Sequence, residues 1–408
     1  MTFSTGAVVS NLYYIQPVSQ TLATSFHVSS GAIGVIITLT QIGYALGLAT
    51  LVPLGDIIER RKLLMSMLSC AVLGLVLTAV APSLLVLGAA ATVVGLTSVA
   101  VQVIVPFAAE LAEKGRQGRV VSTVMSGLLL GVLLSRTIAG VVSSFLGWRA
   151  VFALGAVITA GAALLLWRML PKLVPTTSMP YPTLLASVVR LVKEEPVLRI
   201  RMVYGALCFA SFNAFWASAG FLLAREPYGW SDGQIGAFAL LGVAGAMAAK
   251  FAGRLADKGL ARVATGGFAL IMALSYILLG LGGSSLIALM AGVILMDLGA
   301  QGVHISNQNL ILSLRPEARS RINTAYMTAY FIAASVGAGL SAVLFSAYGW
   351  TGVCVFGAAT PAAASLLWVG DMLWGARRRG ATTHTPAART GGEPVADPKD
   401  TGTESARA

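Results

Sequence analysis

The feature that most constrains the fold is an internal repeat, in which the second half of the chain matches the first at a constant offset. The pair Gly147, Trp148 recurs as Gly349, Trp350. Further matches at the same spacing are Asn11 with Asn213, Gly34 with Gly236, Arg119 with Arg321 and Met125 with Met327. In a very apolar chain, two parallel copies predict a transporter whose binding site lies between the halves. A duplicated helix bundle without transport activity is the alternative.

The apolar content predicts a polytopic membrane protein. Hydrophobic residues make up 56% of the chain and charged residues 11%, more apolar side chain than a soluble domain buries. A membrane-spanning helix needs about 20 apolar residues. Twelve stretches qualify, six in each repeat: 3–25, 31–54, 63–81, 84–111, 120–144, 149–170, 199–224, 232–253, 263–282, 285–312, 321–345 and 350–374.

The net charge of +12 follows from membrane orientation rather than from a nucleic-acid partner. Of the 28 Lys and Arg residues, only Arg136, Arg149 and Arg225 fall outside the loops and helix ends of one side. Cytoplasmic loops of membrane proteins carry such an excess of basic residues. The pattern therefore predicts that both termini lie in the cytoplasm.

The polar stretches divide the chain into parts. Residues 1–170 and 199–374 are the predicted six-helix halves, and residues 171–198 form a cytoplasmic linker in which 183–193 predict a short amphipathic helix. Residues 375–408 have the composition of a disordered cytoplasmic tail. The three cysteines are dispersed over predicted spans, so a disulfide framework is not expected.

Several motifs resemble a known family. The loop LVPLGDIIERRK (51–62) and its counterpart GRLADKGLAR (253–262) resemble the loop signature of the major facilitator superfamily. NLYYIQP (11–17), QVIVP (102–106) and GLLLGVLLSRTIAG (127–140) resemble a bacterial branch of that superfamily, described as proton-driven efflux carriers of small molecules and drugs. The first loop departs from the signature, with Val52 and Glu59 where glycines are usual.

The resemblance implies an all-α membrane protein with twelve transmembrane helices in two six-helix repeats. It implies that spans 1, 4, 7 and 10 line a central cavity, and that spans 2, 5, 8 and 11 form the interface between halves. It also implies transport by alternating access, in which one half rocks against the other.

The loop acids predict a cytoplasmic gate. A carboxylate near a helix N-terminus is stabilised by the helix dipole, by about 0.3–1 kcal/mol when exposed. The resemblance suggests that Asp56 meets the start of span 11 near Arg321, and Asp257 the start of span 5 near Arg119. Ordinary topological charge with a helix cap is the alternative. The predicted gate residues are Asp56, Arg60, Arg119, Asp257, Arg262 and Arg321.

Span 10 contains the strongest candidate for proton coupling. Asp297, Gln301, His304 and Gln308 are spaced by 4, 3 and 4 residues, which places them on one helix face. A charge at mid-membrane costs about 2.5–3.5 kcal/mol even on the lenient insertion scale. A buried carboxylate avoids that cost by taking up a proton, and histidine titrates near neutrality. A hydrogen-bonded polar core without coupling is the alternative.

Arg136 lies deep within span 5, where it cannot easily reach water. Asp297 is the acid predicted at similar depth, so a switchable pair across the halves is one hypothesis. A structural arginine bonded to helix carbonyls is the other. The predicted proton-coupling residues are Asp297, His304 and Arg136.

Amide and aromatic side chains on the facing spans predict the substrate contacts, although each alone could equally connect helices. They suit an uncharged or weakly charged organic molecule. The predicted substrate-binding residues are Asn11, Tyr14, Gln16, Gln102, Asn213, Trp216, Gln301 and Asn307.

These observations predict a secondary transporter in the plasma membrane of a bacterium, exporting small organic compounds in exchange for protons. A proton symporter or facilitator that imports a nutrient is the alternative, and a membrane receptor or scaffold is more remote. No nucleophile motif, metal spacing or phosphate loop is present in the sequence, so we expect neither an enzyme nor a cofactor. The expected partners are a small-molecule substrate, protons and the lipid bilayer, and we expect a monomer.

Overall fold

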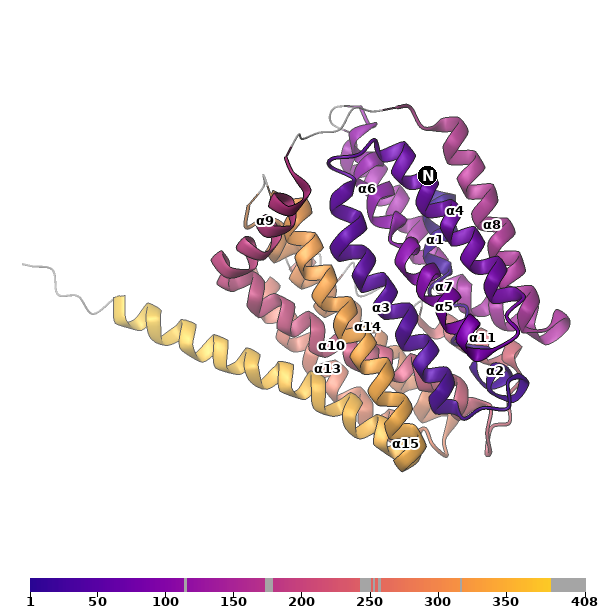
Figure 1. The fold of residues 1–408 in the computed structure, drawn as a ribbon. Helices are drawn as coiled ribbons and strands as arrows, with labels where there is room; N and C mark the ends of the chain where they lie inside the picture. The colour runs from indigo at the N-terminus through magenta and orange to yellow at the C-terminus, as the bar shows by residue number, and fades with distance from the viewer. Residues whose placement is uncertain are drawn as a thin grey trace, which may run out of the picture. The chain divides into compact units, whose positions relative to one another are not determined.

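The computed structural model describes residues 1–113, 116–172, 179–242, 251, 254–255, 258–315 and 318–382. The chain divides into two compact units, Met1–Leu367 and Trp368–Ala408. The predicted gate residue Asp257 and the tail from residue 383 onward lie outside the described residues. All regular secondary structure in the described residues is helical, as the composition predicted (Figure 1).

Eight helical segments lie in the described residues of the first half. They are α1 (Thr2–Ser10), α2 (Ser19–Ser25), α3 (Ser30–Leu54), α4 (Arg60–Ala79), α5 (Leu84–Ser98), α6 (Ala100–Glu110), α7 (Gln117–Leu146) and α8 (Trp148–Met169). Serine caps explain two of the starts. The hydroxyl oxygens of Ser29 and Ser83 accept hydrogen bonds from the backbone N–H groups of Ala32 and Val86, which begin α3 and α5.

The first predicted span is not one helix. Between α1 and α2, residues 11–18 form consecutive turns with i→i−3 hydrogen bonds, such as Tyr13 N–H to the Ser10 carbonyl at 3.0 Å. Pro17 contributes to the break because it has no N–H and disfavours helical geometry at Gln16. Discontinuous helices in transporters commonly line binding sites.

The second half begins after a helical linker. Helix α9 (Tyr181–Glu194) occupies the segment predicted as amphipathic, and it is followed by α10 (Pro196–Leu223). The other elements in the described residues of this half are α11 (Asp232–Phe238), the 3₁₀ turn η1 (Ala239–Gly242), α13 (Ala261–Leu281), α14 (Leu286–Leu312) and α15 (Arg319–Thr382). Span 8, predicted over 232–253, is described only in part.

The repeated Gly-Trp pairs turn the chain in the same way in both halves. Gly147 separates α7 from α8 with φ of 79°, and Gly349 bends α15 with φ of 61°. Glycine suits this left-handed region because it has no Cβ. Each following tryptophan donates a hydrogen bond, Trp148 to the Ser25 hydroxyl at 3.1 Å and Trp350 to the Leu279 carbonyl at 2.7 Å.

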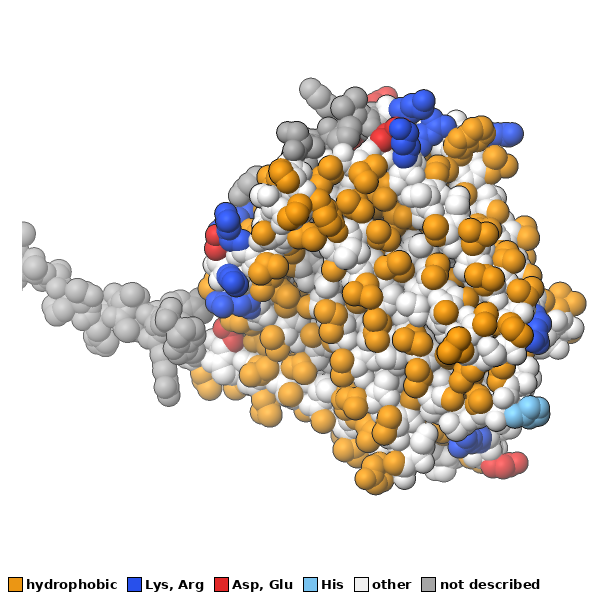
Figure 2. Space-filling view, in the orientation of Figure 1, with side chains coloured by type: hydrophobic (Ala, Val, Ile, Leu, Met, Phe, Trp, Pro, Cys, Tyr) orange, Lys and Arg blue, Asp and Glu red, His pale blue; other side chains and the backbone are white. Residues whose placement is uncertain are grey.

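Helix burial agrees with a membrane-spanning bundle. Nine helices among the described residues are long and apolar enough to cross a membrane, and α15 is one of them although its bend at Gly349 divides it. On α13, Leu270, Leu274, Ile277 and Leu281 are exposed at helical spacing. Figure 2 shows hydrophobic side chains spread over the visible face. Helix α10 is the most enclosed, with 89% of its most apolar window buried. The number of twelve spans stays a prediction.

Candidate functional site

Arg136 on α7 is the centre of the candidate site. Its side chain is 5% exposed, and the guanidinium lies between two aromatic rings, 4.5 Å from the centroid of Tyr13 and 4.5 Å from that of Trp216. Its Nε donates to Gln16 Oε1 at 2.7 Å, and Nη1 donates to the Val132 carbonyl at 3.3 Å. Desolvated cation–π contacts contribute about 2 kcal/mol each and hold the cation in place.

Trp216 on α10 connects Arg136 to Asp297. The indole ring that stacks on the guanidinium also directs its Nε1–H toward Asp297 Oδ1, at 3.5 Å. Asp297 on α14 is 3% exposed. The ion pairs of the described residues do not include one between Arg136 and Asp297. The two predicted charges therefore belong to one site, in which Arg136 lies over the face of the Trp216 ring and Asp297 at its Nε1 edge.

The turn η1 closes this site from the side of span 8. A Cβ added to Gly242 would lie 2.9 Å from Asp297 Oδ2, so the carboxylate packs directly on this backbone. A cavity of about 10 Å³ lies next to the turn η1. Its lining includes Arg136, Gln16, Trp216, Phe238 and Ala239. That volume accommodates about one water molecule.

The broken segment of span 1 presents two different faces. Tyr13 and Gln16 contact Arg136. The other two side chains contact α8 instead. Asn11 donates a hydrogen bond to the Thr159 hydroxyl of α8 at 3.2 Å, and the Tyr14 ring packs edge-on against Phe152 of the same helix. Of the three span 1 residues predicted to bind substrate, the structure brings Gln16 into the site and turns Asn11 and Tyr14 toward α8.

His304, two turns along α14 from Asp297, lies in an aromatic cluster. Its ring is 4.8 Å from that of Tyr330, and Nδ1 is 3.4 Å from the Tyr326 hydroxyl. Stacked rings lead back toward Trp216, from Tyr330 to Phe209 and Phe212. Between Tyr330 and Trp216 this connection consists of the two phenylalanine rings, which have no group that can carry a proton.

The other predicted substrate residues lie in separate places. Asn213 on α10 accepts from Gln41 of α3 at 3.2 Å, a contact between the halves. Gln102 donates to the Tyr44 hydroxyl at 3.4 Å. Asn307 is fully buried and bonds to the Arg201 carbonyl at 3.4 Å, and Gln301 is half-buried.

A second polar cluster joins the halves at the end of the bundle where α2 ends and α11 begins, here called the outer end because it is predicted to face outward. The Thr21 hydroxyl on α2 lies 2.8 and 2.7 Å from the two oxygens of Asp232 on α11. Ser143 on α7 donates to the same carboxylate at 2.5 Å. Deeper along α7, a Cβ on Gly140 would overlap the Asp232 carbonyl oxygen, so the helices touch there.

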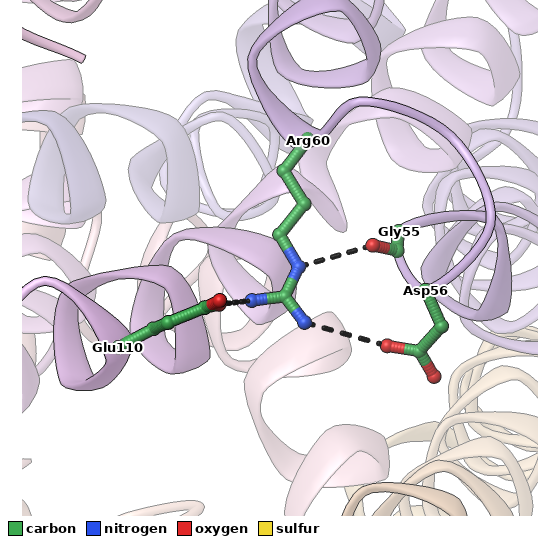
Figure 3. A network of polar contacts seen from close by, with 4 residues as sticks. All are labelled: Gly55, Asp56, Arg60 and Glu110. Atoms are coloured by element: carbon green, nitrogen blue, oxygen red, sulfur yellow. Dashed lines mark hydrogen bonds and ion pairs between the residues drawn. The ribbon is translucent and has the colours of Figure 1, made fainter. Parts of the chain in front are cut away.

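The predicted cytoplasmic gate is described in part (Figure 3). Arg60 extends between two acids, pairing with Glu110 of α6 and lying 3.5 Å from Asp56. Its Nε donates to the Gly55 carbonyl at 3.0 Å. Arg119 and Arg262 are exposed and Arg321 is half-buried.

Sequence reasoning missed several residues of these clusters. Tyr13 lies within the NLYYIQP motif, where the i, i+3 relation to Gln16 could have identified it. Arg201 was counted among the basic residues of loops and helix ends, whereas it is 1% exposed and donates to the Thr265 hydroxyl at 3.2 Å. Thr21, Ser143 and Asp232 carry no local signal, because their meeting depends on how the two halves pack.

A helical membrane protein built of two repeats, with buried polar groups from both halves at one site, belongs to the class of secondary transporters. The sequence matches the profile of the Major Facilitator Superfamily over residues 1–338 and again over 228–398. The chain belongs to this superfamily and is a multi-pass membrane transporter.

Similar proteins support this assignment. The chain is 44% identical over 370 residues to the "Uncharacterized transporter YgaY" of Escherichia coli O157:H7, covering 90% of this chain and 93% of that one. It is 23% identical over 339 residues to the "Probable sugar efflux transporter" of Helicobacter pylori, covering 82% and 85%. Among solved structures, a bacterial homologue of the human lysosomal transporter Spinster, in an inward-facing and unoccupied conformation, has a TM-score of 0.71 at 15% identity, covering 90% and 92%.

Proposed function

We propose that this protein is a proton-coupled exporter of small organic compounds that works by alternating access. The observation that carries the proposal is the Asp297 carboxylate, buried in the membrane-spanning region and in contact with Trp216, on which Arg136 of the other half stacks. An ionised carboxylate is costly to bury, and a bound proton removes that cost. Asp297 can thus alternate between a charged and a neutral form as its access to water changes.

Arg136 makes the attraction between the two halves depend on whether Asp297 is charged or neutral. Since Arg136 comes from the first half and Asp297 from the second, the charge of Asp297 changes the attraction between the halves. Such a dependence couples the protonation of Asp297 to the rocking motion. His304 is proposed to tune this site rather than to pass protons, because the rings of Phe209 and Phe212 lie between its tyrosine neighbours and Trp216.

The two ends of the bundle are proposed to act as gates. The Thr21, Ser143 and Asp232 cluster holds the outer end closed. On the cytoplasmic side, Arg60 contacts Asp56 and Glu110. These contacts are proposed to order the loop between α3 and α4, which would contact the second half when the cytoplasmic side closes. Arg119, Asp257, Arg262 and Arg321 are the proposed remaining members of this cytoplasmic gate.

The direction of transport is proposed on the basis of the bacterial branch and of the relative named for sugar efflux. The basic loops favour a bacterial plasma-membrane location with both termini in the cytoplasm. Both charged residues of the site come from one chain, which is compatible with function as a monomer.

The test is resistance to a broad compound panel in an efflux-deficient bacterium. Intact protein is compared with Asp297→Asn at matched membrane expression, and Glu113→Gln serves as the control because this side chain is 76% exposed. We expect resistance to some compounds, lost in Asp297→Asn and retained in Glu113→Gln. Resistance that survives in Asp297→Asn would remove the proposed proton site. Compound uptake in place of resistance would support the importer.

A further inference from the structure

A second cavity, separate from the Arg136 site, lies at the outer end of the bundle. Its volume is about 440 Å³, within the usual range of small-molecule sites. The first half lines it with residues between Gln20 and Ser30, and the second half lines it with Arg225, Phe345 and Ser346. Since Arg225 is an exposed side chain, the cavity is open to the outer side. Both halves of the transporter therefore form its walls.

Arg225 supplies a positive charge to this outer cavity. Its guanidinium lies over the Phe345 ring, 5.2 Å from the centroid, and Nη2 donates to the Ser30 hydroxyl at 2.9 Å. No ion pair among the described residues involves Arg225, and none of the described residues that line the cavity is acidic. A guanidinium presents its N–H groups as a fork that matches a carboxylate or a phosphate. The charge is therefore available to an anionic ligand.

The two serines at the start of α3 add hydrogen-bond donors. Ser29 Oγ accepts from the Ala32 N–H at 3.3 Å, and Ser30 Oγ accepts from Arg225. Each hydroxyl still has its own O–H to donate, and neither donates to another group in the described part of the chain. The start of a helix also carries the positive end of the helix dipole. This wall of the cavity thus presents donors and positive charge.

These groups favour an anion that also has an apolar part. Arg225 would repel a cation, and a neutral compound would form weaker hydrogen bonds, because those between charged partners are about twice as strong. The cavity is larger than an inorganic ion needs, and Ala23, Val28 and Phe345 contribute apolar surface to it. A carboxylate or phosphate group on an organic molecule fits this chemistry, whether the molecule is a free compound or a lipid.

The two halves touch each other next to the cavity. A Cβ added to Gly34 of α3 would overlap the Ala342 side chain of α15, and one added to Gly31 would lie 3.3 Å from Ser346 Oγ. At the same end of the bundle, α2 and α11 meet through Thr21 and Asp232 (Figure 1). Opening of the outer end separates these contacts, and it would also take Arg225 away from Ser30.

We propose that the outer cavity is a regulatory site for an organic anion, and that the bound anion holds the outer end closed. The anion accepts hydrogen bonds from Arg225 of the second half and from Ser29 and Ser30 of the first. A ligand that needs both walls binds the closed form alone, and by binding it stabilises that form. The site is distinct from the Arg136 site, and the inference holds for any transported compound.

The first test is ligand binding to the purified full-length protein, by isothermal titration calorimetry and ligand-dependent unfolding temperature. The soluble probes are benzoate and glycerol 3-phosphate, with benzamide and glycerol as their neutral counterparts. The lipid probe is short-chain phosphatidylglycerol, with short-chain phosphatidylcholine as its counterpart of zero net charge. We expect at least one anionic probe to bind at least tenfold more tightly than its counterpart. Binding of phosphatidylglycerol alone would identify the anion as a lipid headgroup.

Three variants locate the binding site. Arg225→Gln removes the cation and should weaken anion binding at least tenfold. Arg149→Gln is the matched control, because Arg149 is also an exposed arginine stacked on an aromatic ring, 4.2 Å from Trp148, and does not line the cavity. Thr24→Trp keeps the charge but fills the cavity from an exposed position whose hydroxyl bonds to its own helix, and should also weaken binding at least tenfold. Unfolding temperatures without ligand show that each variant is folded.

The second test measures the opening of the outer end. A cysteine at Ala219, which lines the small cavity beside Arg136, reacts with a membrane-impermeant maleimide in intact cells when this end opens. The background carries Cys70→Ser, because Cys70 is exposed. Where labelling is slow compared with opening and closing, a soluble anion at about ten times its Kd should slow it about tenfold. Arg225→Gln should abolish this effect, and Arg149→Gln should retain it. If the anion is a lipid, Arg225→Gln should instead speed labelling without any added compound.

Three results would overturn the inference. Equal binding of the anionic probes and their counterparts, or no binding by the whole panel, would refute the anion site. Anion binding that survives both Arg225→Gln and Thr24→Trp would refute its location in the outer cavity. Binding that leaves the labelling rate unchanged would refute the regulatory role. Resistance that depends on Asp297 is measured separately, so the export proposal stands or falls without this site.

Discussion

Removing the Asp232 carboxylate should open the outer end of the bundle. Asp232 receives hydroxyl hydrogen bonds from Thr21 of α2 and Ser143 of α7, so both contacts connect the second half to the first. A hydrogen bond to a charged group contributes about 1.5–3 kcal/mol. Asp232 is half-buried, so water replaces part of each hydrogen bond when it is lost. We therefore take about 2 kcal/mol as the contribution of the two hydrogen bonds together to the free energy of the closed outer end. Asp232→Ala should then raise the outward-open population about 30-fold.

Cysteine labelling measures this population. Ala219 is 3% exposed and lines the small closed cavity, so Ala219→Cys reports opening toward the outer side. The background carries Cys70→Ser, because Cys70 is exposed whereas Cys208 and Cys354 are buried. In intact cells, a membrane-impermeant maleimide should label the reporter about 30-fold faster with Asp232→Ala, under conditions in which opening and closing are fast compared with labelling, so that the rate follows the open population.

Glu113→Ala is the control, since it removes an exposed acid elsewhere on the surface. Labelling as slow in Asp232→Ala as in this control would refute the reasoning. It would mean that close helix packing, as at Gly140, keeps the outer end closed without the carboxylate.

Two further predictions concern stability and the assignment of span 1. Gly95→Ala should lower stability in detergent by about 1–3 kcal/mol, because the new methyl group would overlap the Thr40 carbonyl of α3. Gly161→Ala, which has nothing within 4 Å, should not destabilise; equal unfolding temperatures for the two variants would contradict the packing argument. Asn11→Ala should lower stability by about 1 kcal/mol through the lost Thr159 contact, with the transport KM unchanged. A raised KM in Asn11→Ala would contradict this prediction and would indicate that Asn11 contacts the substrate.

The candidate site was only partly predictable. The stripe on span 10 identified Asp297 because helical spacing places its members on one face, and the α14 helix agrees. The depth of Arg136 within an apolar run indicated that it needs a partner. The sequence could not show that this partner is a pair of aromatic rings with Gln16, because the turn of residues 11–18 decides which span 1 side chains face α7.

The amino-acid sequence determined what depends on local composition and spacing. Apolar runs define the spanning helices, serines cap the starts of α3 and α5, and a glycine before a tryptophan turns the chain at the same place in each repeat. The superfamily was recognisable because its motifs are also local patterns of residue type and spacing. Only the tertiary structure decided which polar groups meet. Trp216 contacts both Arg136 and Asp297, and Asp232 meets Thr21 and Ser143, through contacts between segments 80 to more than 200 residues apart. Such contacts depend on how the two halves pack, and no local pattern in the chain encodes that geometry.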